Sequence, residues 1–501
     1  MQIAVSCLFP FCVRTVLIYR FGMEYLGLSS LFTSVLKTLS LMELGFGTAI
    51  VYSLYKPVAE GNTERICAYL AYYRKIYRFI GLAILTVGLL LIPFLHKLVH
   101  DPVLPGGLNL YTCYLIFLGN TVISYLLYGY MTSIPIAYQR RDILSRINMG
   151  ISVLSCTVKI FILLASRSFY LYLLAMPAMT IINNLAVFHV VRRMYPGLVS
   201  KGEISLEQKR DLKKKVSGIM VNKLTCVSRN SIDSLCISAF IGLVATGIYD
   251  NYFIVMLSIQ SVVTVICTSM MASVGNSIAL ESRNKNYSDM RQFDFMFMAI
   301  GGWSTVCMLC LYQPFILTWL GKDRMFNSLI VLEFCLYYYI LLSGSIRWVY
   351  HEGAGLWWEC RYIMIGEAAV NIVLNIVLCR IWGVAGIVLA TILSVFATNY
   401  ILCPELLFRL YFKNNKLHEY WMDHFRYAAT TVLTAGTSWL LCDFVLPMSM
   451  VEGKAPLKCI ICLGGRIIVC TVITAGAMWI IWHKSERFSN ALQWLKKLKH
   501  A

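Results

Sequence analysis

Charged side chains are scarce in this sequence, and acidic ones are the scarcest. Asp, Glu, Lys and Arg make up 14% of the 501 residues, whereas a soluble domain carries about 25%. Hydrophobic residues make up 58% of the chain, and the mean hydropathy is +0.68. This composition excludes a soluble domain and predicts an all-α integral membrane protein that crosses the bilayer many times.

Long polar segments are missing as well. No connection between apolar runs exceeds about 25 residues, which is too short for a soluble catalytic domain. A membrane-embedded polymerase or ligase would need a sizeable outside loop with reactive residues, and the outside loops have His96 and His100 as their only histidines. Because the connections are short and poor in reactive residues, we expect no enzyme activity.

The first residues lack the basic region and cleavage site of a signal peptide, so we expect none.

The 18 cysteines lack the spacing of a disulfide framework. Two pairs are spaced C-x-x-C, Cys307 with Cys310 and Cys459 with Cys462, but both lie within apolar runs and have no His or carboxylate cluster nearby. We interpret these cysteines as small packing residues and predict no metal site.

About fourteen apolar runs are long enough to span a bilayer, since roughly 20 helical residues cross its core. They cover residues 1–20, 29–54, 77–98, 108–134, 147–165, 169–191, 216–240, 245–279, 294–319, 327–349, 361–379, 382–407, 424–446 and 459–482. About thirty of the 44 Lys and Arg lie in every second connection and in the C-terminal tail. This asymmetry predicts that both termini are cytoplasmic, and it excludes nucleic acid as the partner of the +19 net charge.

A weak internal repeat predicts two halves. A shift of about 215 residues aligns residues 26–28 with 241–243 and Arg14 with Arg229. We predict a six-helix lobe in residues 1–191, a basic cytoplasmic linker in 192–215 and a second six-helix lobe in 216–407. Two extra spans would follow in 408–483, and a basic amphipathic tail in 484–501.

The apolar segment 216–243 carries charges that cannot face lipid. An ionised side chain near the bilayer centre costs at least about 2.5–3.5 kcal/mol. Asn222, Cys226, Arg229 and Asp233 fall on one face of the expected helix. We predict that this face lines a cavity between the two lobes.

The first spans of both halves concentrate ionisable residues. Arginine offers phosphate a rigid fork and lysine offers a mobile charge, so the cations predict a site for an anionic amphiphile. These cations are Arg14, Lys37, Lys223 and Arg229. Carboxylates in the same spans are candidates for proton or sodium coupling, because burial can raise a carboxyl pKa into the working range. These carboxylates are Glu43, Asp233 and Asp250.

Structural alternatives stay open for several of these residues. Arg229 and Asp233, four residues apart, can neutralise each other, and Lys37 can pair with Glu43. The isolated residues within other spans are interpreted mainly as contacts between helices. They are Lys159, Glu333, Glu367 and Arg466.

Several motifs resemble those of the Wzx-type polysaccharide repeat-unit flippases, which belong to the multidrug/oligosaccharidyl-lipid/polysaccharide exporter (MOP) superfamily. The similar segments, spread over nearly the whole chain, are EYLGLSSLF at 24–32, ELGFGTAIVYSLYKP at 43–57, YDNY at 249–252, GNSI at 275–278 and AGLWWE at 354–359. The resemblance implies two six-helix lobes in a V around a central cavity, plus two C-terminal helices.

The resemblance also implies a function. The cargo would be an undecaprenyl-diphosphate-linked oligosaccharide, moved from the cytoplasmic to the periplasmic leaflet of the bacterial inner membrane. The implied route is a cation-lined lumen driven by a proton or sodium gradient, with no cofactor. Membrane lipid and the polysaccharide polymerase machinery would be its partners. A cation-coupled small-molecule antiporter of the same superfamily remains the alternative, although it would favour a cavity dominated by carboxylates.

Overall fold

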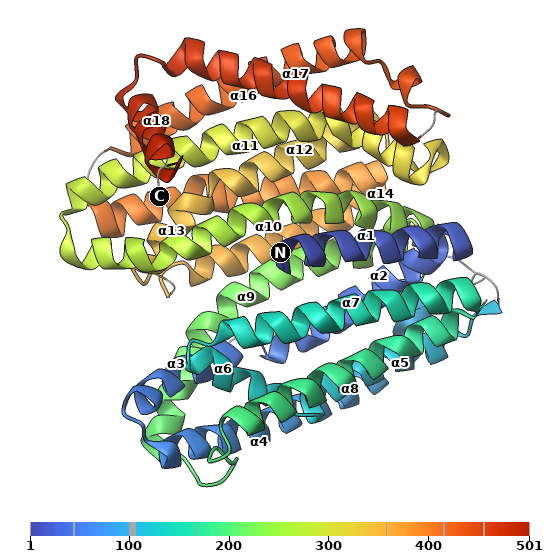
Figure 1. The fold of residues 1–501 in the computed structure, drawn as a ribbon, viewed down its shortest axis with the longest axis vertical. Coiled ribbons are helices and arrows are strands. Elements are labelled where there is room, and N and C mark those ends of the chain that lie inside the picture. The colour runs from blue at the N-terminus through green and yellow to red at the C-terminus, as the bar shows by residue number, and fades with distance from the viewer. Residues whose placement is uncertain are drawn as a thin grey trace. The chain divides into compact units, whose positions relative to one another are not determined.

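The structure is a computed structural model that describes residues 2–43, 46–99, 107–166, 168–356, 358–413, 416–453 and 456–499 (Figure 1). Within these ranges the regular structure is helical and contains no strand. The chain packs as two compact units, Met1–Asp250 and Asn251–Ala501. The lobe boundaries expected at residues 191 and 216 stay predictions.

The first unit contains nine α-helices and three short 3-10 helices among its described residues. They are α1 (Gln2–Phe21), α2 (Met23–Leu39), η1 (Ser40–Glu43), α3 (Phe46–Ala59), α4 (Thr63–Leu90), η2 (Ile92–Leu98), α5 (Leu110–Leu126), η4 (Gly129–Thr132), α6 (Ser133–Ala137), α7 (Arg141–Ala165), α8 (Phe169–Met194) and α9 (Leu206–Phe240). α10 (Leu243–Leu280) begins in this unit and continues into the second.

The second unit continues with helices throughout its described ranges. They are α11 (Arg283–Leu320), η5 (Lys322–Arg324), α12 (Ser328–Ser343), α13 (Ser345–Gly353), α14 (Arg361–Val395), the π-helix η6 (Phe396–Leu402), α15 (Cys403–Leu407), the π-helix η7 (Phe408–Phe412), α16 (Leu417–Val445), η8 (Met448–Met450), α17 (Pro456–Trp482) and α18 (Glu486–Lys499). α18 covers most of the expected amphipathic tail.

Eight helical runs in the described ranges are long and apolar enough to cross a membrane, and two bent pairs bring the number to ten. The bent pairs are Thr63–Leu90 with Ile92–Leu98, at 65°, and Leu110–Leu126 with Gly129–Ala137, at 56°. Pro93 accounts for the first bend, because proline has no N–H and disfavours a helical backbone in the preceding residue. The chain is a multi-pass helical membrane protein, which confirms the expected all-α membrane fold. The expected number of about fourteen spans and the V-shaped pair of lobes stay predictions.

Two glycine hinges start α2 and α10 in the same way. Gly22 (φ 111°) separates α1 from α2, and Gly242 (φ 130°) separates α9 from α10. Glycine adopts such backbone angles readily because it has no Cβ. The hinges are 220 residues apart, so the repeat expected at about 215 residues is shifted. The counterpart of Arg14 is therefore Ser234, and the predicted equivalence of Arg14 with Arg229 is wrong.

The two hinged helices cross closely through a second pair of glycines. A Cβ atom on Gly27 would lie 1.9 Å from the carbonyl oxygen of Leu243. Reciprocally, a Cβ atom on Gly247 would lie 2.7 Å from the carbonyl oxygen of Met23. Each glycine stands five residues after its hinge and meets the residue that follows the other hinge. The contact thus has local two-fold symmetry, and it leaves no space for a side chain.

Replacing Gly27 by alanine is expected to destabilise the protein by about 1–3 kcal/mol, because the added methyl group must push α2 away from α10. Gly119→Ala in α5 is the control, since no heavy atom lies within 4 Å of a Cβ built there. In a helix that change is neutral or stabilising. Thermal unfolding in detergent measures both variants, and equal midpoints would contradict the close crossing.

The two spans expected at 361–379 and 382–407 form two helices within the helical run Arg361–Phe412. The chain folds back between them, since Asn371 donates hydrogen bonds to Thr391 and Ser394. The run is broken at Gly383, whose φ of 60° and ψ of −132° are not helical. The break lies at the junction that the sequence predicts, beside Arg380. Glycine permits this backbone at little steric cost.

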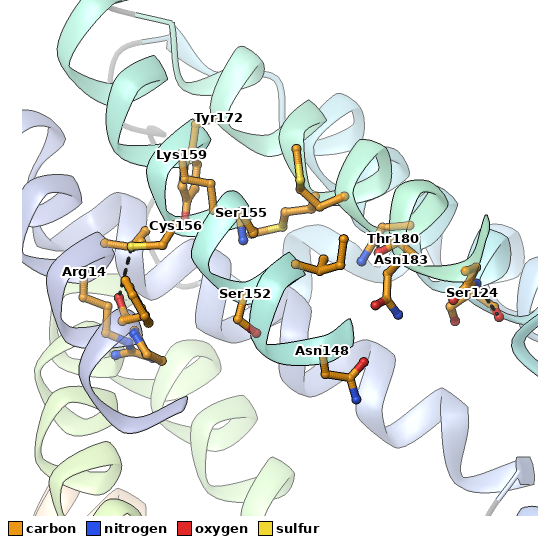
Figure 2. Close-up of a pocket in the computed structure, with 18 residues that line it drawn as sticks. Arg14, Ser124, Asn148, Ser152, Ser155, Cys156, Lys159, Tyr172, Thr180 and Asn183 are labelled. Atoms are coloured by element: carbon orange, nitrogen blue, oxygen red, sulfur yellow. Dashed lines mark hydrogen bonds between the residues drawn. The ribbon is translucent and has the colours of Figure 1, made fainter. Parts of the chain in front are cut away.

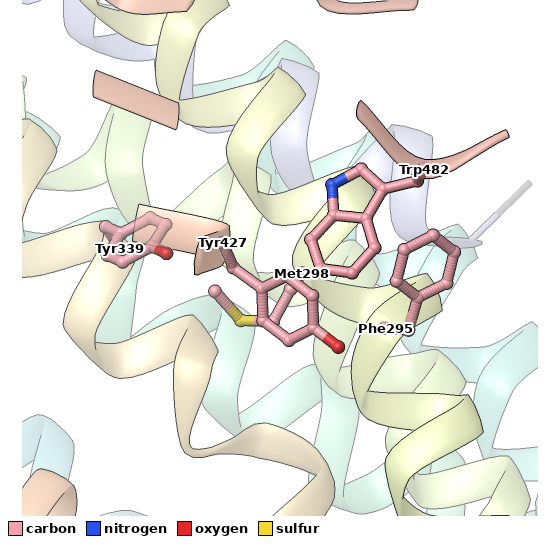
Figure 3. Close-up of a cluster of buried hydrophobic side chains, with 5 residues drawn as sticks. All are labelled: Phe295, Met298, Tyr339, Tyr427 and Trp482. Atoms are coloured by element: carbon pink, nitrogen blue, oxygen red, sulfur yellow. The ribbon is translucent and has the colours of Figure 1, made fainter. Parts of the chain in front are cut away.

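α11 is the central element of the second unit and packs against α12, α13, α16, α17 and α18. A cluster of four aromatic side chains and one methionine joins α11, α12, α16 and α17 (Figure 3). Its buried members are Phe295, Met298, Tyr339, Tyr427 and Trp482. From α18, Phe488 and Ala491 pack against this cluster, and the backbone carbonyl of Arg487 accepts a hydrogen bond from Gln292 at 2.9 Å. The C-terminal helix is therefore held against the unit.

Trp482→Ala is expected to lower the free energy of unfolding by about 3–5 kcal/mol, because it removes the indole ring that packs against Phe295 and Tyr427. Trp479→Ala is a matched control one turn earlier in α17. Trp479 is 60% exposed, whereas Trp482 is 6% exposed. The midpoint of thermal unfolding in detergent compares them, and a smaller loss for Trp482 than for Trp479 would refute the role of the cluster.

Candidate functional site

The first unit contains a cavity of about 730 Å³ bordered by α1, α5, α7 and α8. Its polar lining residues are Arg14, Asn120, Ser124, Asn148, Ser152, Ser155, Lys159, Thr180, Asn183 and Asn184 (Figure 2). In the part of the chain that the structure describes, no carboxylate lines it. The volume is in the range of ordinary small-molecule and cofactor sites.

A polar stripe on α7 forms one wall of the cavity. Asn148, Ser152, Ser155 and Lys159 follow one another at intervals of three or four residues, so they share one helical face. Figure 2 shows them in sequence along the helix. Asp142 in the first turn suits the positive end of the helix dipole, and the other faces of α7 are largely apolar. The helix therefore presents its polar groups to the cavity.

Amide side chains from α5 and α8 form the opposite wall. Thr180 donates a hydrogen bond to the Oδ1 atom of Asn120 at 2.7 Å, and Asn184 donates to the backbone carbonyl of Ser124 at 3.4 Å. The Oδ1 atom of Asn183 is buried without a hydrogen-bond partner among the described residues. A buried acceptor without a donor is costly, so this atom is suited to a hydroxyl or amide group of a ligand.

Arg14 lies at the edge of the cavity in an ion pair. Its Nη2 atom lies 2.5 Å from the Oδ2 atom of Asp250, and the Ser30 hydroxyl donates to the same oxygen at 2.7 Å. Both charged side chains are 19% exposed. When α2 and α10 are aligned on their hinge glycines, Gly22 and Gly242, Ser30 corresponds to Asp250. This hydrogen bond therefore joins equivalent positions of the two helices. Asp250 thus neutralises most of the charge of Arg14.

Lys159 is the cavity's uncompensated charge. No carboxylate lies within ion-pair distance of its Nζ atom in the described ranges, and it is half-buried among Cys156, Tyr172 and apolar side chains. An ammonium group in such a place gains from an anionic ligand. The cavity can therefore hold an anion beside hydroxyl-rich chemistry.

Glu43 lies outside this cavity, in a cage of tyrosines. Its Oε2 atom accepts a hydrogen bond from Tyr125 at 2.5 Å, and its Oε1 atom accepts one from Tyr77. The ring of Tyr73 packs edge-on against the ring of Tyr77, with the two ring centroids 4.4 Å apart. Lys37 forms no ion pair with Glu43 in the described residues. The pairing considered from the sequence is therefore not formed.

The remaining candidate residues are dispersed. Asp233 is buried in α9 and accepts a hydrogen bond from Tyr249 at 3.0 Å. Lys37 is exposed in the last turn of α2 and does not line the cavity. Lys223 and Arg229 lie on α9, but their side chains fall outside the described residues. Among the five candidates whose side chains the structure describes, Arg14 and Asp250 form an ion pair.

Sequence reasoning missed the α7 stripe. It interpreted Lys159 as a contact between helices because each polar residue was weighed singly. The helical spacing from Asn148 to Lys159 is a signal present in the sequence. The amides on α5 and α8 carry no comparable signal, since their approach to α7 depends on tertiary packing.

Neither a known protein family nor a curated protein matches this sequence. Solved structures do match. Lipid II flippase MurJ in an inward closed conformation has a TM-score of 0.66 at 13% identity, covering 95% of this chain and 97% of that one. An inward-facing multidrug resistance MATE family transporter of the MOP superfamily has a TM-score of 0.62 at 10% identity, covering 84% and 96%.

A third structure, the MATE transporter VcmN of Vibrio cholerae, has a TM-score of 0.56 at 14% identity, covering 83% of this chain and 96% of that one. At such identities the likeness concerns the fold alone. The chain therefore has a fold similar to that of these transporters, and the superfamily and the Wzx branch expected from the sequence stay predictions.

Proposed function

We propose that this protein flips undecaprenyl-diphosphate-linked oligosaccharide repeat units across the bacterial inner membrane, for the biosynthesis of O-antigen, capsule or exopolysaccharide. The observation that carries the proposal is the cavity of the first unit. It places an uncompensated lysine among amides and hydroxyls. A diphosphate needs the cation, and sugar hydroxyls need the amides. The fold shared with the lipid II flippase MurJ supports a lipid-linked cargo.

In this proposal the Arg14–Asp250 pair links cargo to an ion gradient. A diphosphate that reaches Arg14 competes with Asp250 for the guanidinium group. The released carboxylate then gains affinity for a proton or sodium ion. The ion therefore binds the cargo-loaded and the empty protein with different affinities, and alternating access needs such a difference. Glu43 and Asp233 are further coupling candidates. Both termini would be cytoplasmic, and the polymerase machinery would take the cargo on the periplasmic side.

A cation-coupled multidrug antiporter is the competing proposal, and the fold shared with MATE transporters supports it. An antiporter for cationic drugs would use a cavity carboxylate. In the described residues no carboxylate lines the cavity, and Asp250, which pairs with the lining residue Arg14, is already engaged by Arg14 and Ser30. This engagement favours an anionic cargo.

Reconstituted vesicles distinguish the two proposals. One set carries a fluorescent undecaprenyl-diphosphate disaccharide, and leaflet exchange is followed by quenching of the outer leaflet. A second set carries a fluorescent cationic dye under an imposed proton or sodium gradient. Exchange of the lipid-linked sugar without dye movement supports the flippase. Gradient-driven dye movement without exchange of the sugar would establish the antiporter.

A further inference from the structure

Four cysteines from three helices of the second unit lie together. The sulfur atoms of Cys310 on α11, Cys442 on α16 and Cys470 on α17 all lie within 4.8 Å of one another. These three side chains are at most 1% exposed. Cys307, one turn before Cys310, packs against them. All four thiols are free of disulfides.

A buried arginine lies beside the cluster. Arg466, one turn before Cys470 on α17, is 4% exposed. Its Nη1 atom donates to the backbone carbonyl of Cys310 at 2.7 Å, and its Nε and Nη2 atoms donate to that of Leu446 at 3.2 and 2.6 Å. Within the described ranges no carboxylate pairs with it. A cation buried with neutral partners alone is costly, and an anionic centre next to it would relieve that cost.

We propose that Cys310, Cys442 and Cys470 bind one divalent thiophilic metal ion, with Zn²⁺ as the type. Each thiol releases its proton, so the three thiolates and the metal ion carry one net negative charge. The guanidinium of Arg466 balances this charge. A monovalent ion would leave the buried site negative, so the charge favours a divalent ion.

The cluster has the chemistry of a closed structural site. Structural zinc is usually held by four ligands, with zinc–sulfur distances of about 2.3 Å. Cys307 packs beside the three cysteines, and as a fourth thiolate it would bring the net charge of the site to −2, of which Arg466 balances one. The ion would add a bond among α11, α16 and α17, which also contact one another through side-chain packing and polar contacts such as that of Arg466 with the carbonyl of Cys310. This revises the interpretation of Cys307 and Cys310 as packing residues only. The inference does not depend on the proposed function.

The metal content of the purified protein tests the site. The protein is prepared in detergent with a reductant and no chelator, equilibrated with Zn²⁺ and freed of excess metal. About one Zn²⁺ per chain is expected, and Cys442→Ala and Cys470→Ala should each lower it about tenfold or more. Co²⁺ in place of Zn²⁺ should give thiolate-to-metal charge-transfer absorption. Wild-type protein that retains no metal would overturn the proposal, as would a disulfide between these cysteines.

The second C-x-x-C pair is the matched control. Cys459 and Cys462 lie on the same helix, α17, and are as buried, but they pack in a separate cluster with Val451. Cys459→Ala and Cys462→Ala should leave the metal content unchanged. Arg466→Gln should weaken Zn²⁺ binding, and Arg466→Lys should restore it in part. Equal metal loss from the control pair would assign the metal to nonspecific thiol binding and overturn the site.

Discussion

Lys159→Met is expected to slow the leaflet exchange of a fluorescent undecaprenyl-diphosphate disaccharide by about tenfold to hundredfold. The substitution keeps the length of the side chain and removes the cavity's uncompensated charge. A hydrogen bond from a charged donor is worth about 1.5–3 kcal/mol, and the lost affinity lowers the exchange rate at limiting cargo. Initial rates in vesicles of matched protein content measure the effect.

The control for this prediction is Lys75→Met. Lys75 lies in α4, outside the cavity, in a surface ion pair with Glu203 in which the two side chains are 72% and 77% exposed. Such pairs contribute about 0–1 kcal/mol, so exchange should stay near the wild-type rate. Equal slowing by both substitutions would show a general effect of surface charge and would remove Lys159 from the site.

Asp250→Asn is expected to lower the free energy of unfolding by about 3 kcal/mol, because it leaves the partly buried Arg14 without its counter-charge. Arg14→Gln should have a similar effect through the stranded carboxylate. The double variant Arg14→Gln/Asp250→Asn should be more stable than the sum of the two single losses implies, since neither charge is then left alone. Thermal unfolding in detergent of the wild type, the two single variants and the double variant measures the coupling energy of the pair.

The exposed pair of Lys322 and Glu452 provides the reference cycle. Its atoms lie 3.0 Å apart, but the two side chains are 76% and 51% exposed. Its coupling should be at most about 1 kcal/mol because water screens it. If the Arg14–Asp250 coupling were no larger, the pair would be an ordinary surface contact, and the coupling role proposed for Asp250 would lose its basis.

The sequence predicted features that depend on local composition. Apolar length identified the membrane fold, and the break at Gly383 lies where the junction of two spans was expected. Glycine breaks of this kind leave a local trace in the sequence. The repeat was recognised, but its register was not, since short similar triplets aligned better at about 215 residues than the hinges do at 220.

The candidate site was predicted only in part, for a physical reason. Arg14 and Asp250 were both identified as ionisable residues within spans, but their pairing joins α1 to α10 over 236 residues. The thiols of Cys310, Cys442 and Cys470 likewise come from three helices. Contacts of this kind depend on how helices pack, which the helical period of a single segment does not encode.

In the proposed function, the cavity of the first unit holds the diphosphate and sugar of the cargo. The most direct test is photo-crosslinking with an undecaprenyl-diphosphate disaccharide that carries a photoreactive group on the sugar, followed by mapping of the labelled peptides. Labelling is expected on α7 between Asn148 and Lys159 and on α8 between Met176 and Asn184. It should be lost when unlabelled cargo competes. Saturable labelling found only outside these two segments would contradict the claim.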